Sequence, residues 1–361
     1  LIIYTSGFSQ ASTSAEDILQ SLNVQNELIE NSIVKNLEFK NIGPSVMSGR
    51  VTDLEVNPNN PSEFYVAYAS GGLWHTVNNG NTFTPIMDNS DTQNIGDFDI
   101  DWSTRLIIVG TGENNSSRSS YAGVGILKSD DNGKTWKNIG LNDSHHIGKI
   151  VINPNNPNEI VVAVLGHLYS KNKERGIFKT IDGGVTWENT LYIDESTGII
   201  DLDISPNNFK IQFASSWQKS RKAWDFKGNG EKSGIYKSVD SGNTWNLIST
   251  QKSGFPTGNG VGRIGLAVFD SKTLYAVVDN QFRRPKSKAS TEKTDLSKNY
   301  FESISKERFL KIEDLKLDKF LTTNSFPKKY NSTKIKELVK NDLIKPSDLK
   351  LYLEDANTVM F

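Results

Sequence analysis

Apolar and polar residues alternate along short segments of this chain, and the alternating segments recur. Five of them, at 53–69, 97–111, 149–165, 201–217 and 265–279, carry apolar residues two positions apart. A two-residue period is that of a β-strand, whose successive side chains point to opposite faces. The strings between the apolar pairs, such as NPNNP in the first and third segments, are rich in turn-forming residues. The pattern predicts pairs of antiparallel strands joined by tight turns.

A second repeat follows each of the first four strand pairs. Its copies are TVNNGNTF (76–83), SDDNGKTW (129–136), TIDGGVTW (180–187) and SVDSGNTW (238–245), each preceded by a short apolar strand. One unit therefore holds four strands in about 50 residues, which is typical of a propeller blade. We predict an all-β chain built as a β-propeller of four-stranded antiparallel blades.

The second repeat, called the turn motif below, has a structural interpretation. Its Asp or Asn can accept hydrogen bonds from the amides of its own turn, and its Gly can adopt a positive φ. The final aromatic residue is expected to pack between sheets. We therefore assign these residues to the fold rather than to catalysis: Asn78, Gly80, Asp131, Gly133, Trp136, Asp182, Gly184, Trp187, Asp240, Gly242 and Trp245.

The last three copies resemble the Asp-box, or BNR repeat, and the resemblance covers about residues 37–280. That repeat marks sialidases, xyloglucanases of glycoside hydrolase family 74 and sortilin-type sorting receptors. The resemblance implies a propeller fold, but it does not indicate whether the protein is an enzyme or a receptor. The strings NIGPSVMSGRV (41–51) and GTGENNSSRSSYAG (110–123) resemble secreted bacterial sortilin-like proteins that are often labelled glycosyl hydrolases.

The chain divides into four expected segments. Residues 1–10 look like the end of a secretory signal, with an ordinary N-terminal strand as the alternative. Residues 11–36 predict a helix capped by Ser14. Residues 37–280 hold four and a half blades, and 281–361 form a basic linker followed by helices inserted into the fifth blade.

Two further expectations concern this last segment and the ring. Ser332 and Ser347 are candidate helix caps in it. Because the fifth unit has only its first two strands and no copy of the turn motif follows it, we interpret the chain as the N-terminal part of a larger propeller whose remainder is missing. The alternative is a small closed ring with a helical cap.

Composition narrows the class of protein. The net charge of −1 gives no signal for a nucleic-acid partner, although residues 281–361 are net positive. The absence of cysteine excludes disulfides, thiol catalysis and a lipoprotein anchor. No apolar run reaches the roughly 18 residues of a membrane span. We expect a secreted, periplasmic or cell-surface bacterial protein, with no cofactor.

Propeller topology sorts the loops onto two faces. The turns between first and second and between third and fourth strands share one face, and the longer, more varied loops share the other. Function normally lies on such varied loops. Arginine and aromatic residues there suit a carboxylate or a sugar, although each arginine could instead pin neighbouring blades. The candidate ligand-binding residues are Arg50, Arg118, Tyr121, His167, Arg175, Arg221, Trp224 and Arg263.

The innermost strands carry charged residues at one shared position. Asp53, Asp97 and Asp201 occupy it in three units, and Lys149 replaces them in the third. These side chains are expected to line the central channel, where polar groups are also normal for structural reasons.

Catalysis and metal binding have weaker candidates. Glycoside hydrolysis needs two carboxyl groups about 5–9.5 Å apart, and nothing in the sequence pairs Glu113, Glu174 and Asp225. The Arg-Ile-Pro string that a sialidase implies is absent, and Ala69 and Ser70 stand where a xyloglucanase implies an acidic residue.

The histidines 145, 146 and 167 are conceivable metal ligands. Adjacent residues of a strand point to opposite faces, so only one of the first two could ligate, and we expect no metal site. The leading hypothesis is a sortilin-like propeller that binds a peptide or glycan. The alternatives are a glycoside hydrolase acting on an extracellular polysaccharide, which leaves enzyme activity open, and a structural or adhesion module.

Overall fold

The computed structural model describes residues 12–37, 49–282 and 296–358. The predicted signal remnant and most of the predicted basic linker lie outside these residues. The chain forms two compact units, residues 1–282 and 283–361, and each is described by itself.

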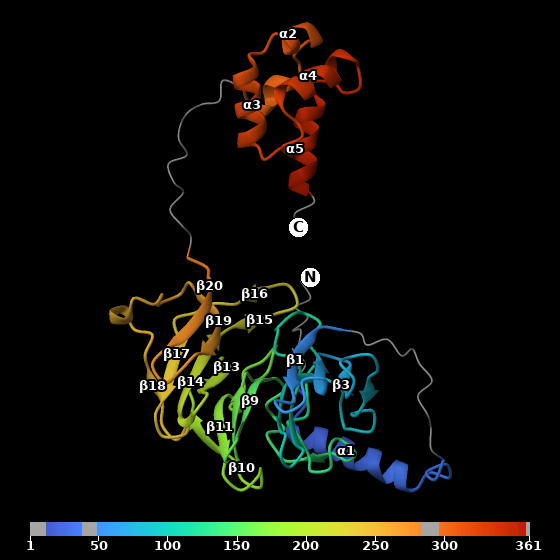
Figure 1. Ribbon diagram of the computed structural model, residues 1–361, viewed down its shortest axis with the longest axis vertical. Coiled ribbons are helices and arrows are strands. Elements are labelled where there is room, and N and C mark those ends of the chain that lie inside the picture. The colour runs from blue at the N-terminus through green and yellow to red at the C-terminus, as the bar shows by residue number, and fades with distance from the viewer. Residues whose placement is uncertain (1–11, 38–48, 283–295, 359–361) are drawn as a thin grey trace, which may run out of the picture. The chain divides into compact units, whose positions relative to one another are not determined.

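Four sheets of four antiparallel strands follow one another along the first unit (Figure 1). The first holds β1 (Val51–Val56), β2 (Phe64–Tyr68), β3 (Gly72–Thr76) and β4 (Thr84–Pro85). The second holds β5 (Ile95–Asp101), β6 (Leu106–Thr111), β7 (Ile126–Ser129) and β8 (Lys137–Asn138). The third holds β9 (Ile147–Asn153), β10 (Asn156–Val164), β11 (Gly176–Thr180) and β12 (Glu188–Leu191). The fourth holds β13 (Thr197–Ser205), β14 (Asn208–Gln218), β17 (Gly234–Ser238) and β18 (Asn246–Leu247).

Two smaller sheets complete the described part of this unit. A hairpin of β15 (Ser220–Arg221) and β16 (Phe226–Lys227) lies between β14 and β17, and β19 (Val261–Val268) pairs with β20 (Leu274–Asn280). A short 3₁₀ turn, Gln251–Ser253, precedes β19. The predicted fold class, an all-β propeller of four-stranded blades, is confirmed.

The apolar core lies between neighbouring blades. One buried cluster joins Tyr65 and Leu73 of the first blade to Phe98 and Ile107 of the second. Equivalent clusters join the second blade to the third, the third to the fourth, and the fourth to β19 and β20. Each blade is therefore stabilised mainly by burying its faces against its neighbours.

Carboxylates tie the innermost strands together. Asp97 and Asp99 of β5 accept the amides of Ile150 (2.7 Å) and Ile152 (2.6 Å) of β9. Asp201 and Asp203 of β13 do the same for two amides of β19. Adjacent blades thus gain hydrogen bonds that run across the sheets rather than within them.

The turn motif closes on itself through hydrogen bonds. In the second copy, Asp131 Oδ1 accepts the amide of Thr135 at 2.9 Å and the hydroxyl of Ser129 at 2.8 Å, while the Gly133 amide donates to Ser129 Oγ at 2.8 Å. Bonds from Thr135 and Ser129 lower the pKa of Asp131 to about 2. Gly133 has φ +85°, and a Cβ there would lie 2.6 Å from Ile86. Asp182 and Asp240 repeat the arrangement.

The aromatic residue of the motif connects consecutive blades. The indole N–H of Trp136 donates to the carbonyl of Ile86 at 2.8 Å, and that of Trp187 to Ile139 at 2.8 Å. Trp245 donates to a side chain of the preceding blade at 3.2 Å. Each acceptor lies about one repeat earlier in the chain, so the indole is both packed and hydrogen-bonded across the blade boundary.

The N-terminal helix is α1 (Ala15–Glu30). As predicted, Ser14 is its N-cap, and its hydroxyl oxygen accepts the amide of Asp17 at 3.1 Å. Among residues 12–37, 49–282 and 296–358, no helix combines the length and the apolar character that crossing a membrane requires.

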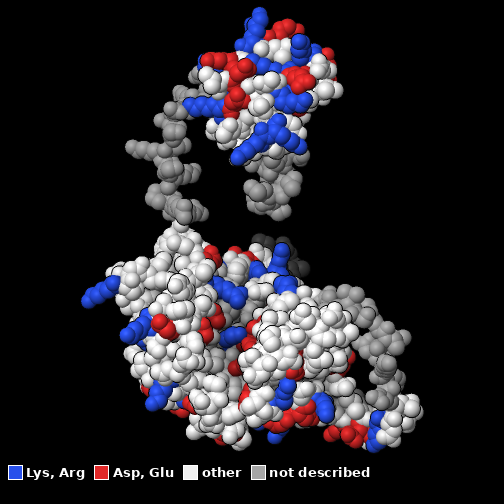
Figure 2. Space-filling model, viewed as in Figure 1, with Lys and Arg blue, Asp and Glu red and all other residues white. Residues whose placement is uncertain are grey.

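The second unit is helical. It contains a 3₁₀ turn, Lys298–Phe301, followed by α2 (Lys306–Leu310), α3 (Asp314–Thr323), α4 (Ser332–Lys340) and α5 (Asp348–Thr358). Its core is built around Phe301, Phe309 and Phe320. Figure 2 shows basic and acidic side chains interspersed over its visible face.

One predicted cap in this unit is wrong. Asn331, not Ser332, caps α4 and accepts the amide of Lys334. Ser332 is already inside the helix, where its hydroxyl donates to Asp318 at 2.9 Å. Asn and Ser are equally good caps, so sequence alone did not decide between neighbours. Ser347 lies immediately before α5.

Candidate functional site

A loop between β6 and β7, residues 112–123 and called the bridging loop here, contacts several blades. The side-chain amide of Asn114 donates to the carbonyls of Gly96 (3.2 Å) and Gly148 (3.1 Å), which belong to the innermost strands of two blades. A Cβ on Gly112 would lie 1.8 Å from the carbonyl oxygen of His145, so only glycine fits there. The loop is therefore packed against the mouth of the channel.

Residues from three other segments bond to the same loop. Tyr169 donates its hydroxyl to the carbonyl of Arg118 at 3.1 Å, and Arg221 donates to the carbonyl of Ser116 at 3.1 Å. Arg263 donates to the side-chain oxygen of Asn115 at 3.1 Å. Loops that the sequence places far apart thus meet on one face.

Glu113 anchors the bridging loop. It is 1% exposed, and Oε1 accepts Arg50 Nε at 2.8 Å together with a second contact from Arg50 Nη2. Its backbone carbonyl accepts His146 Nδ1 at 2.7 Å. The pair with Arg50 balances the charge of this buried carboxylate through Oε1, while Oε2 has no hydrogen-bond partner among the described residues.

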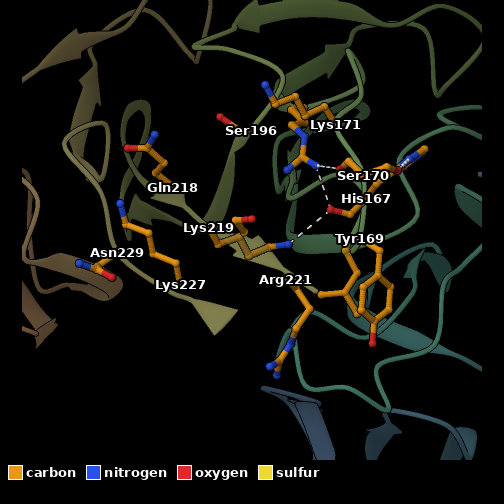
Figure 3. Close-up of a pocket in the computed structure, with 13 residues that line it drawn as sticks. His167, Tyr169, Ser170, Lys171, Ser196, Gln218, Lys219, Arg221, Lys227 and Asn229 are labelled. Atoms are coloured by element: carbon orange, nitrogen blue, oxygen red, sulfur yellow. Dashed lines mark hydrogen bonds between the residues drawn. The ribbon is translucent and has the colours of Figure 1, made fainter. Parts of the chain in front are cut away.

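A pocket of about 400 Å³ opens between the loops of the third and fourth blades (Figure 3). It is called the basic pocket here. Its side chains come from 167–175, from the end of β14 and from the β15–β16 hairpin, with Ser196 and Asn229 at its edges. Among the described residues that line it there is no Asp or Glu. Its cationic lining residues are Lys171, Arg175, Lys219, Arg221 and Lys227.

Lys219 is the most unusual cation of this pocket. It is 5% exposed, and its Nζ points to the carbonyl of His167 at 3.4 Å (Figure 3). No ion pair with Lys219 occurs in the described part of the chain. Burial, and then the nearby charges of Arg175 and Arg221, lower its pKa to about 7. An anion entering the pocket would favour the protonated, charged lysine.

Arg175 departs from its expected role at a ligand surface. It is 2% exposed, and its guanidinium donates to the carbonyls of Leu165 (2.7 Å), His167 (2.8 Å) and Ser170 (3.0 Å). These bonds fold the loop that forms one wall of the pocket. Arg175 therefore positions the wall through Nη1 and Nη2, while its buried Nε has no hydrogen-bond partner among the described residues.

The other candidates occupy different environments. Arg118 is exposed, and Tyr121 and Trp224 are 57% and 83% exposed. Trp224 and the exposed Asp225 lie at the turn of the β15–β16 hairpin, where Lys222 Nζ is 5.8 Å from the indole centroid. The structure thus brings His167, Arg175 and Arg221 to the basic pocket, while these rings remain on the open surface.

Glu174 differs from the other two acidic candidates. It is partly buried, and its Oε2 has no hydrogen-bond partner in the described part of the structure. Burial first, and also the charge of Asp143, raise its pKa to about 7. The three carboxylates therefore have three separate environments: Glu113 is paired, Asp225 is solvated and Glu174 is desolvated.

A second cavity, of about 430 Å³, is lined by the innermost strands and by Arg263. Lys149 lies at its wall and bonds Asp53 at 3.1 Å and Asp97 at 2.9 Å. Asp201 also lines it. The charged residues expected at the channel are thus there, and the lysine of the third unit neutralises carboxylates of the two preceding units.

Sequence reasoning did not single out Lys171, Lys219 or Lys227. Lys219 directly follows Trp217 and Gln218 at the end of a long apolar strand. A lysine that continues a buried strand is a recognisable signal, because a charge is rarely carried into a core without a function or a partner. The other two lysines look like ordinary surface residues in the sequence.

No family model matches the chain. Of curated proteins, it is similar to the vacuolar protein sorting/targeting protein 10 of Kluyveromyces lactis, at 27% identity over 137 residues, which are 36% of this chain and 8% of that protein. Of solved structures, it is similar to an ancestral GH74 enzyme at 16% identity and a TM-score of 0.48, over 66% of this chain and 30% of that chain. It is also similar to the GH74 enzyme of Niastella koreensis, at 22% identity and a TM-score of 0.46, over 63% of this chain and 35% of that chain. This chain thus spans a small part of each of these proteins.

Proposed function

We propose that the protein is a secreted Asp-box propeller that binds an anionic peptide or glycan in the basic pocket. One observation carries the proposal: Lys219 is buried at the wall of a pocket whose described lining contains lysine and arginine but no Asp or Glu. Secretion belongs to the proposal because the strings at 41–51 and 110–123 resemble secreted sortilin-like proteins.

Energetics support an anionic ligand. A buried ammonium without a counter-ion is costly, and a carboxylate that enters the pocket removes that cost while gaining charge-assisted hydrogen bonds. Arg221 lies at the lower edge of the pocket beside Tyr169 in Figure 3, so a guanidinium and an aromatic ring stand close to one end of it. Such a pair suits the end of a chain that carries both a charge and an apolar or sugar surface.

The test uses two matched pairs of ligands. Acidic peptides and uronic-acid oligosaccharides are compared with their amide or methyl-ester forms by calorimetry on the folded protein at pH 6. We expect the free carboxylate forms to bind and the neutral forms to bind at least about 10-fold more weakly. Lys219→Met and Arg221→Ala should each weaken binding by about 1–3 kcal/mol.

Asn60→Ala and Asn156→Ala are the controls. Asn60 lies in, and Asn156 directly follows, a turn between the first and second strands of a blade on the opposite face, and each side chain accepts one backbone amide. They should leave the affinity unchanged. Binding that does not distinguish carboxylates from esters, or equal losses in both groups of variants, would rule out this pocket as the site.

Glycoside hydrolysis is a second candidate, favoured by the buried Oε2 of Glu174, which has no hydrogen-bond partner among the described residues; burial also raises the pKa of Glu174 to about 7, which suits a general acid. It needs a second carboxyl group within about 5–9.5 Å. Glu174→Gln should abolish hydrolysis of a responsive polysaccharide if the candidate is correct, and unchanged hydrolysis would exclude Glu174 as the acid.

A further inference from the structure

A cluster of two histidines and an aspartate lies beside the basic pocket. We propose that Asp143, His145 and His167 bind a divalent transition-metal ion of the Zn²⁺ class. One ligand atom from each residue lies within 4.8 Å of the other two. Asp143 and His145 belong to the segment before β9, and His167 belongs to the loop after β10, so the ion would join two loops. His167 also lines the basic pocket, but the inference does not rest on the anionic ligand proposed above.

His167 is already oriented for ligation. Its Nε2 lies 3.0 Å from Asp143 Oδ1, and its Nδ1 lies 2.7 Å from Ser170 Oγ. A ligating histidine normally donates its other ring N–H to an oxygen, which fixes the tautomer and the ring direction. Ser170 can accept that N–H while Nε2 faces the ion. The side chain of His167 is 4% exposed and that of Asp143 is 36% exposed, so an ion could reach the cluster from the aspartate side.

His145 stands in an uncommon backbone conformation. Its φ is +55°, a left-handed value that few residues other than glycine adopt. The imidazole stacks on that of His167, with centroids 3.6 Å apart and planes inclined by 19°. Its Nε2 is buried and has no hydrogen-bond partner in the described part of the chain. Leaving such an atom unsatisfied costs about 1–3 kcal/mol, and a metal ion would satisfy it.

Glu174 lies in the same loop as His167, close in sequence to Asn172, and is our candidate for a fourth ligand. Its Oε2 is a second buried atom without a partner among the described residues. Asn172 donates its side-chain amide to the carbonyls of both Asp143 (2.7 Å) and Glu174 (3.3 Å), which ties the two segments together. Two unsatisfied ligand atoms of different residues therefore accompany one His–Asp pair.

The chemistry of the donors selects the ion. Imidazole nitrogens with carboxylate oxygens suit Zn²⁺ and its first-row neighbours, whereas Mg²⁺ and Ca²⁺ prefer oxygen alone. Bonds of about 2.0–2.1 Å place tetrahedral ligand atoms about 3.4 Å apart. Because imidazole binds a metal in the plane of its ring, binding would turn the rings of His145 and His167 out of their stack. The positive charge of Arg175 repels a cation at this site, and the negative charges of Asp143 and Glu174 would offset that repulsion. The sequence argument against a metal site treated His145 and His146 as strand residues, whereas β9 begins at Ile147.

The experiment measures Zn²⁺ binding to the full chain after treatment with a chelator, by competition with a chromophoric chelator. We expect one saturable equivalent, and a Co²⁺-loaded sample should show the visible absorption of a tetrahedral site. His145→Ala and Asp143→Asn should each weaken binding at least about 100-fold, and Ser170→Ala should weaken it about 10-fold.

His75→Ala is the matched control, since His75 also contacts a carboxylate, Glu63, at 3.1 Å, but in the first blade. It should bind Zn²⁺ as the parent does. If His145→Ala does not fold by circular dichroism, the isosteric Glu174→Gln replaces it, with an expected loss of about 10-fold or more. Absence of a saturable equivalent, or losses as large in His75→Ala as in the cluster variants, would overturn the proposal.

Discussion

The two faces of the propeller hold together by different means. In the turn motif, the bonds that the Asp131 and Ser129 side chains make with their own turn link residues two or four positions apart. On the opposite face, the bridging loop bonds residues that lie 51, 105 and 148 positions away. One face repeats a local device, and the other is assembled once from distant segments.

The turn motif therefore contributes mainly to stability, whereas the bridging loop gives its face features that occur once in the molecule. A local turn can be copied from blade to blade because it brings its own partners. A loop that depends on three other segments cannot be copied, and it can carry buried groups such as Lys219 that a stable fold alone would not favour. Three predictions test this division, beginning with the largest expected change in stability.

Removing a motif indole should cost the most. Trp136→Ala and Trp187→Ala each lose partly buried aromatic surface and a hydrogen bond to the preceding blade. We expect a loss of about 3 kcal/mol in the free energy of unfolding for each, measured by denaturant titration. The motif would be only a surface turn if both variants unfolded at the parent's midpoint.

Removing Arg50 should reduce the stability of the protein more than removing the charge of its partner Glu113. Arg50→Ala leaves a carboxylate that is 1% exposed without its partner, whereas Glu113→Gln leaves an arginine side chain that is 52% exposed and can be solvated. We expect a loss of about 2 kcal/mol for the first and less than about 1 kcal/mol for the second. Thermal melts of both variants at pH 7 measure the difference. Equal losses would mean that Glu113 does not need its arginine.

Lys219→Met should raise stability by about 1–2 kcal/mol at pH 6 while it weakens binding of the acidic ligand. Folding lowers the pKa of this lysine from 10.5 to about 7, so the folded state disfavours its proton. That destabilisation is complete below about pH 7 and disappears as the pH rises to the unfolded value. Melts of parent and variant should therefore differ most at pH 6 and converge near pH 10. A parent that is the more stable protein at pH 6 would contradict a buried, unpaired charge.

The same division explains what could be predicted from the sequence. The blades and the turn motif were predictable because strand period and Asp–Gly turns are local properties. The basic pocket was not, since the burial of Lys219 depends on loops of two blades and on Arg175 inside one of them. His145 was misplaced for a similar reason: its left-handed backbone is set by the loop around it, not by neighbouring residue types.

Lys149 has a consequence for how such a repeat protein can evolve by duplication. Burial first, and then the nearby carboxylates of Asp99 and Asp53, raise the pKa of Glu55 to about 8, so the wall of the channel is already crowded with acidic groups. A chain made by copying one aspartate-bearing unit would lose the single lysine at this shared position. Its carboxylates would then repel one another, and they would have to take up protons to lie side by side. The blades are therefore not interchangeable. Exchanging the third unit for any neighbour would alter the charge of the whole channel, while its turns would still fold.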